Sequence, residues 1–344
     1  MPPATSTYNN GRSRLESQGD GRLFPERGTE EGVTWYTMPQ LRMALEGVHN
    51  YLPTPFHPDY RLNASGTATN VAYYASTTPQ EQTIVVGGGY GEGWKLDVLE
   101  HRALVAAAVR AARGRMPVMA GVIAGYRIAL HLARNAESAG ADAVIVFPPP
   151  DGFPGPEGCF AFFREIAKAI RIGVVVFLRH EFWPEVLQRL GQQENVIGFL
   201  PPLNLAPGFY DRVADSIDRL DLKHLLWIAE NEPAAMLSFP LGARAYTTAA
   251  AAFVPGACRE LWQQGTRGNR NAMRAVAKER IDPILRIRSY RPGYGISGVK
   301  AAMELLGGAG GPVRPPGTQV LNEDRPGIAE ILKKHSEIKR LDPI

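Results

Sequence analysis

Short apolar runs alternate eight times with helix-like segments between residues 48 and 265. Near-continuous apolar runs of this length are typical of strands that are buried on both faces of a parallel sheet. Eight βα units in about 220 residues suit a closed barrel, so the chain is predicted to be an α/β protein, a (β/α)8 TIM barrel. The expected strands are residues 48–52, 83–86, 117–123, 143–147, 173–178, 196–200, 225–229 and 243–248.

A doubly wound open sheet is the alternative. Such a sheet would need a nucleotide-binding fingerprint at its first strand-to-helix turn. The first strand instead runs into Pro53-Thr54-Pro55, and no GxGxxG pattern occurs there. The closed barrel is therefore favoured.

The barrel is expected to occupy residues 43–265. Residues 1–42 are poor in aliphatic side chains and are interpreted as a mobile N-terminal extension. Residues 266–344 are predicted to be a C-terminal helical extension that packs on the barrel or on a neighbouring subunit. Residues 60–79 are ambiguous, because Asn63, Ser65, Gly66 and Thr67 weaken an expected helix.

The composition limits the function classes. A net charge of +4, scattered over the chain, does not favour nucleic-acid binding. Cys159 and Cys258 lack CxxC spacing, so neither a disulfide framework nor a zinc site is expected. No apolar run approaches the roughly 20 residues of a membrane helix, and no secretory signal is evident. We expect a cytoplasmic protein that binds no membrane, cofactor or metal.

Candidate site residues follow the expected strands, because catalytic groups of such barrels lie at the strands' C-terminal ends. The glycine-rich turn 87–93 follows the second strand and contains Tyr90; Lys95 lies just beyond it. Arg179, His180 and Glu181 form the densest polar cluster, after the fifth strand. The remaining candidates are His49, Asn50, Asp151, Glu230, Glu232, Tyr246, Thr247 and Thr248.

Roles follow from side-chain chemistry. Arg179 is suited to hold a carboxylate bidentately, and His180 to move a proton near neutral pH. Gly88 and Gly89 lack the Cβ atoms that would keep a ligand from the backbone. Glu92 is expected to cap the following helix rather than act on a ligand. Glu230 and Glu232 lack the close ligand spacing of a metal site.

Five segments together resemble the dihydrodipicolinate synthase / N-acetylneuraminate lyase family. They are similar to its GTTGE turn, its PVIAGV strand, its AGADA segment and its C-terminal helix with the following loop: residues 88–92, 117–122, 139–143, 300–307 and 311–316. The resemblance implies a (β/α)8 class I aldolase or lyase. It also implies a small 2-keto acid or sugar acid as ligand, no added cofactor, and a homo-oligomer, dimer or tetramer.

The chain departs from the family at its reactive positions. The Schiff-base lysine aligns with Leu200, and the proton-shuttling tyrosine aligns with Phe177. The two threonines of the GTTGE turn become Gly89 and Tyr90. Lys95 is the one lysine just after a strand's C-terminal end, but it begins a helix and is expected to point to solvent.

Three hypotheses remain open. The first is a lyase acting on a small keto or sugar acid without a covalent intermediate, with Arg179 on the carboxylate and His180 or Tyr90 as acid or base. Gly88, Gly89 and Tyr246 would complete the substrate-binding set. The second is a non-catalytic barrel that binds a small acid or a partner protein. The third is ordinary Schiff-base chemistry through a relocated lysine, chiefly Lys95.

Overall fold

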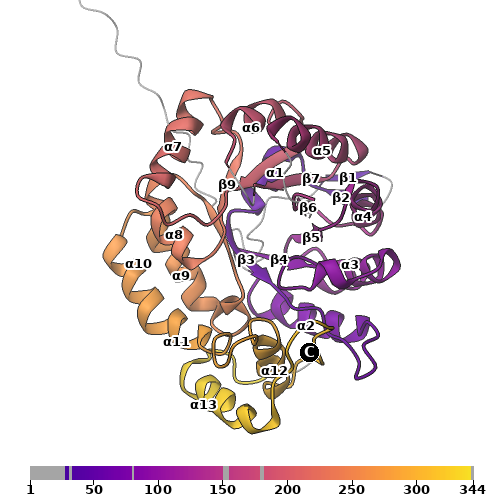
Figure 1. Ribbon diagram of the computed structural model, residues 1–344, viewed down its shortest axis with the longest axis vertical. Coiled ribbons are helices and arrows are strands. Elements are labelled where there is room, and N and C mark those ends of the chain that lie inside the picture. The colour runs from indigo at the N-terminus through magenta and orange to yellow at the C-terminus, as the bar shows by residue number, and fades with distance from the viewer. Residues whose placement is uncertain (1–27, 31–32, 80, 150–154, 179–181, 342–344) are drawn as a thin grey trace, which may run out of the picture.

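The chain folds into a closed barrel of eight parallel strands, which confirms the predicted fold class (Figure 1). The computed structural model describes residues 28–30, 33–79, 81–149, 155–178 and 182–341. Neighbouring strands around the barrel follow the order β10-β3-β4-β5-β6-β7-β8-β9. Their bounds are β3 Gly47–Tyr51, β4 Gln82–Val86, β5 Val118–Val122, β6 Ala143–Val146, β7 Gly173–Phe177, β8 Val196–Leu200, β9 Leu226–Ala229 and β10 Ala245–Thr248. Outside the barrel, β1 (Gly28–Glu30) pairs antiparallel with β2 (Val33–Trp35).

Helices follow the strands around the barrel. They are α2 Ala64–Thr77, α3 Val98–Ala112, α4 Tyr126–Ser138, α5 Pro156–Ala169, α6 Pro184–Leu190, α7 Phe209–Arg219, α8 Glu232–Ser238 and α9 Pro255–Thr266. The ambiguous segment 60–79 contains α2. Asn63 begins that helix, because its side chain accepts a hydrogen bond from the Gly66 N–H at 2.8 Å. Within the described residues, no helix is long and apolar enough to cross a membrane.

Alternate residues of each strand face opposite sides of the barrel wall. One set packs against the surrounding helices in the larger core. The other fills the barrel interior, where it contacts one further helix. The interior residues include Val85, Met119, Ile145, Val175 and Leu226.

The helix α1 (Met38–Ala44) covers the end of the barrel at which the strands begin. Leu41 and Leu45 are buried in the interior cluster, near the first residues of β3 and β7. Thr37 begins this helix in a capping box with Gln40. Regular structure therefore starts before residue 43, within the segment interpreted as a mobile extension. The domain division as a whole stays a prediction.

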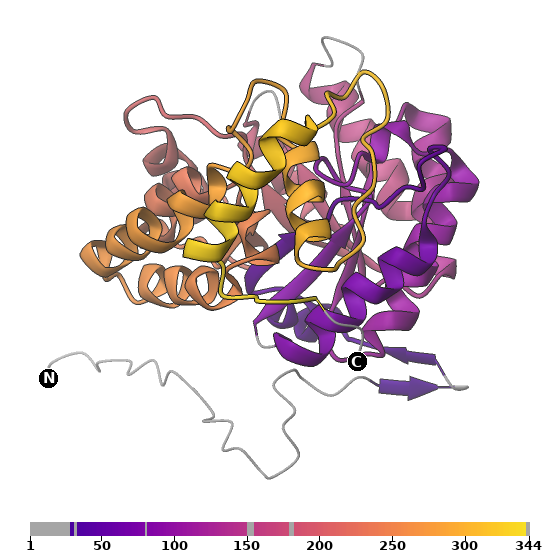
Figure 2. The same ribbon diagram turned by 90° about the horizontal axis from the view of Figure 1, so that it is seen from below.

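The C-terminal extension packs on the outside of the barrel, beside α2 and α9 (Figures 1 and 2). It contains α10 Arg270–Val276, a π-helical turn Ala277–Ile281, α11 Asp282–Leu285, α12 Ser297–Leu305 and α13 Arg325–His335. The Asn70 amide exchanges hydrogen bonds of 2.8 and 2.9 Å with the Ala309 backbone. The Glu337 carboxylate accepts from the N–H groups of Gly256 and Ala257. These contacts fix the extension to two sides of the barrel.

Candidate active site

The barrel mouth, at the C-terminal ends of the strands, has an apolar half. Phe147 follows β6, Phe177 ends β7 and Leu200 ends β8. The Phe147 and Phe177 rings meet edge to face with centroids 5.0 Å apart, and Phe177 lies opposite Leu200 in the β7–β8 register. Each of the three side chains is at most 7% exposed. This half of the mouth is apolar and shielded from water, and none of these three side chains carries a reactive group.

The opposite half of the mouth is polar. Tyr51 ends β3, and its ring meets that of Tyr90 edge to face at 6.1 Å. Glu230 follows β9, and its Oε2 accepts a 2.6 Å hydrogen bond from the Leu203 N–H. The Thr247 hydroxyl on β10 donates to the Glu230 carbonyl oxygen. Two phenols and a carboxylate therefore face the mouth, from the end of β3, the turn after β4 and the residue after β9.

The C-terminal extension contributes Arg288, which lies just beyond α11. Its guanidinium carbon is 4.3 Å from the centroid of the Tyr90 ring. The Arg288 Nε donates to the Gly295 carbonyl oxygen at 3.2 Å. Nearby, the Glu232 carboxyl is 5% exposed and accepts from the Thr248 hydroxyl.

Burial sets the protonation of this polar half. It is the main cause that raises the pKa of Tyr51 and of Tyr90 above the ordinary value. The charge of Glu230 adds to both shifts, and the charge of Arg288 opposes the shift in the pKa of Tyr90. Burial likewise raises the pKa of Glu232, while the Thr248 hydrogen bond opposes the rise. The two phenols therefore keep their protons at neutral pH and act as hydrogen-bond donors.

The glycine-rich turn is compact because its backbone approaches the neighbouring strand. Gly87 has a φ of +63°, a conformation that favours glycine. A Cβ at Gly121 on β5 would overlap the Gly87 carbonyl oxygen, and a Cβ at Gly88 would lie 2.8 Å from the Tyr51 ring. A Cβ at Gly89 would meet nothing within 4 Å. Gly87 is therefore required by its backbone conformation and Gly88 and Gly121 by packing, whereas the space beside Gly89 is open.

Replacing Gly121 by alanine is expected to lower the free energy of unfolding by about 1–3 kcal/mol, because the new methyl group must displace backbone. Gly89→Ala is the matched control and is expected to leave stability unchanged. Urea unfolding of the two variants measures both values. Equal stabilities would show that the close approach of the turn and β5 does not constrain the fold.

Glu92 at the end of this turn joins a buried ionic network. Its carboxylate oxygens lie 2.6 Å from Lys300 Nζ and 2.9 Å from Lys95 Nζ, and accept from the Arg314 N–H at 3.0 Å. The side chains of Glu92 and Lys300 are fully buried. The expected helix cap was wrong: Asp97 caps α3, and the Glu92 side chain caps nothing.

All eight lysines of the chain are described, and none points into the barrel interior. Lys95 is 10% exposed, with Nζ bonded to Glu92 and to the Arg314 carbonyl oxygen, so the expectation that it points to solvent was wrong. Lys300 shares Glu92 and also donates to the Pro312 carbonyl oxygen. The others are exposed on the outside: Lys168, Lys223, Lys278, Lys333, Lys334 and Lys339.

Several sequence candidates are not brought to the mouth. Tyr246 faces the helices, where its hydroxyl donates to the Cys258 carbonyl oxygen at 3.0 Å and its ring packs on Phe239. His49 bonds the Leu45 carbonyl near the barrel floor, and burial lowers its pKa to about 4, so it stays neutral.

Other candidates lie outside the described residues: Asp151, Arg179, His180 and Glu181. Among the residues that are described, no three His, Cys, Asp or Glu side chains gather as a metal site would require. Sequence reasoning did not find Tyr51 or Arg288. Only the final position of β3, two residues before Pro53, could have indicated Tyr51.

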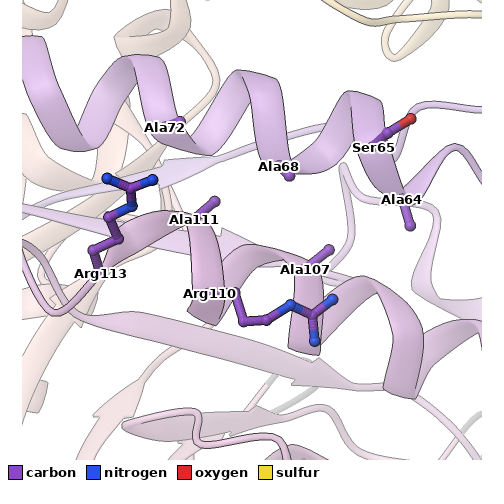
Figure 3. Close-up of a pocket in the computed structure, with 8 residues that line it drawn as sticks. All are labelled: Ala64, Ser65, Ala68, Ala72, Ala107, Arg110, Ala111 and Arg113. Atoms are coloured by element: carbon purple, nitrogen blue, oxygen red, sulfur yellow. The ribbon is translucent and has the colours of Figure 1, made fainter. Parts of the chain in front are cut away.

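An outer groove between α2 and α3 is lined mostly by alanine (Figure 3). Its polar groups are Ser65 of α2, Arg110 of α3 and Arg113 just beyond α3. It lies between two helices on the outside of the barrel, apart from the inward-facing strand ends. The mouth is therefore the better candidate for chemistry.

A barrel whose polar groups converge at the C-terminal ends of its strands is the arrangement of (β/α)8 enzymes. The chain belongs to the dihydrodipicolinate synthetase family, whose family model matches residues 44–335. This family, and the dehydratase names of relatives, place the chain among lyase-like proteins by resemblance.

Three similar proteins illustrate the relation. A probable 5-dehydro-4-deoxyglucarate dehydratase of Bradyrhizobium diazoefficiens is 28% identical over 85% of this chain and 93% of its own. A protein of the same description from Streptomyces avermitilis is 31% identical over 83% and 86%. The crystal structure of dihydrodipicolinate synthase from Oceanobacillus iheyensis superposes with a TM-score of 0.75 at 21% identity, covering 86% of this chain and 98% of that one.

Proposed function

We propose that the protein binds a small sugar acid at the barrel mouth and eliminates water from it without a Schiff base. The observation that carries the proposal is the placement of the lysines: β8 ends in buried Leu200, and every lysine of the chain lies away from the interior. By resemblance, Leu200 occupies the family's lysine position. A leucine has no nucleophile, and Phe177 beside it has no hydroxyl.

The substrate class follows from the relatives and from the mouth. The similar proteins are described as dehydratases of a deoxyglucarate derivative, which is a sugar acid. The polar half of the mouth offers two protonated phenols and a carboxylate, which suit a polyhydroxylated acid. The apolar half beside them excludes water.

The chemistry needs one base and one acid. In an elimination, a base takes a proton from the carbon next to a carbonyl group, and the hydroxyl of the adjacent carbon leaves as water after receiving a proton. We assign the Glu230 carboxylate as the base and the Tyr90 phenol as the acid. The proton returns from Glu230 to Tyr90 through water before the next turnover. Arg179 and His180 keep their predicted roles, on the carboxylate and as a second acid or base.

Borohydride trapping tests the non-covalent route. After incubation with pyruvate and borohydride, the intact mass of the protein is expected to be unchanged, because no lysine amine reaches the mouth. A class I aldolase treated in parallel shows that trapping works. A trapped adduct would refute the proposal, and peptide mapping would name the lysine.

A non-catalytic binding protein is the second candidate. The close packing of Phe147, Phe177 and Leu200 favours it, because these groups fill the half of the mouth where the family's nucleophile would stand. It predicts that sugar acids raise the melting temperature while NMR detects no product.

A further inference from the structure

Arg288 reaches the mouth from outside the barrel. It follows α11 in the C-terminal extension, yet its guanidinium lies over the Tyr90 ring that the β4 turn provides. Its side chain is half-buried. A guanidinium over an aromatic face is held in a fixed plane, which orients its N–H fork.

The charge of Arg288 has no carboxylate partner among the described residues. Four other arginines of the extension pair with carboxylates: Arg280 with Glu260 and Glu337, Arg291 with Glu323 and Asp324, Arg314 with Glu100, and Arg325 with Glu304. No carboxylate oxygen of the described chain lies within 4.0 Å of an Arg288 nitrogen. Its partners among the described residues are the Gly295 carbonyl oxygen and Tyr90, through both the ring face and a side-chain hydrogen bond.

The buried Glu232 is a described carboxyl whose pKa the charge of Arg288 lowers, but no ion pair within 4.0 Å joins the two side chains. The Glu232 carboxyl accepts from the Thr248 hydroxyl on β10. Burial is the larger effect and raises this pKa, which favours the neutral form. Within the described part of the chain, this half-buried cation therefore has no ion-paired carboxylate at the mouth. A partly desolvated guanidinium binds an anion more strongly than an exposed one.

We propose that Arg288 is an anion anchor of the mouth and holds a carboxylate of the bound acid through its guanidinium fork, in addition to the role predicted for Arg179. This inference rests on the proposed function for the identity of the acid. The Tyr90 hydroxyl lies beside the anchored carboxylate and donates to the same ligand. The C-terminal extension is therefore part of the binding site.

The test compares Arg288→Gln with Arg288→Lys and with Arg286→Gln. Arg286 is exposed, two residues away on the same segment, and makes no part of the mouth. The probes are D-glucarate and pyruvate, with glucitol as the uncharged analogue, measured by calorimetry. We expect Arg288→Gln to weaken the affinity for both acids at least tenfold. Arg288→Lys should reduce the affinity by a smaller factor, and Arg286→Gln should bind both acids as tightly as the wild type does.

Protection from phenylglyoxal provides a measurement on the unaltered protein. D-glucarate is expected to slow modification of Arg288, mapped by peptide mass, and to leave Arg286 unaffected. Equal affinity of the wild type and Arg288→Gln, or no protection, would overturn the anchor while leaving the proposed function standing. Anchored acid without any turnover would instead refute only the lyase activity. Absence of acid binding in the wild type, or binding of inorganic phosphate alone, would overturn the carboxylate assignment.

Discussion

Replacing Glu92 by glutamine is expected to lower the free energy of unfolding by about 3–5 kcal/mol, because it leaves the fully buried Lys300 ammonium without a counter-ion. Glutamine keeps the shape of the side chain, so the loss reports charge rather than packing. Urea unfolding at neutral pH measures it. Glu92 joins the turn after β4 to Lys300 and to the Arg314 backbone. Both the turn and the C-terminal extension are therefore expected to become less ordered in this variant.

The double variant Glu92→Gln/Lys300→Met separates charge from structure. Burial lowers the pKa of Lys300 to about 8 even though Glu92 opposes the shift, so desolvation outweighs pairing for this amine. Removing both buried charges is therefore expected to recover part of the lost stability, because Lys95 loses the Glu92 carboxylate but keeps the Arg314 carbonyl oxygen. Asp218→Asn, which breaks an exposed pair with Lys223, is the matched control and should have no measurable effect. If Glu92→Gln were as stable as the wild type, the ionic network around Glu92 would not stabilise the fold.

Replacing Glu230 by glutamine is expected to lower turnover of a sugar acid by about 10²–10⁴-fold, because the amide cannot accept the substrate proton. The amide oxygen still accepts the Leu203 N–H, so the loop after β8 should keep its position. Melting temperature and ligand affinity are expected to change little. The loss should therefore appear in kcat rather than in binding.

Glu185→Gln is the control for this change. Glu185 is an exposed carboxylate at the start of α6, with only a long contact to Arg219. Unchanged turnover in Glu230→Gln would remove Glu230 from the mechanism. A wild-type protein that binds sugar acids without converting them would establish the binding alternative.

Much of the fold was predictable because it depends on local patterns. Apolar runs and helical periodicity indicated the eight strands, and glycines marked the β4 turn. The helix α2 was ambiguous because Asn63 is a poor helix interior residue but a good N-cap, and only its position relative to Gly66 decides which role it takes. Of the site, the sequence indicated Tyr90, Glu230 and the apolar Phe177 and Leu200.

The sequence by itself determined the repeated βα units and which residue types end each strand. The tertiary structure decided which way those residues point and which distant residues they meet. Tyr246 faces the helices rather than the mouth because it has the outward phase of its strand. Glu92 pairs with Lys300, 208 residues away, and Arg288 arrives at Tyr90 from the extension. Contacts between distant residues depend on how the elements pack, and no local periodicity encodes that packing.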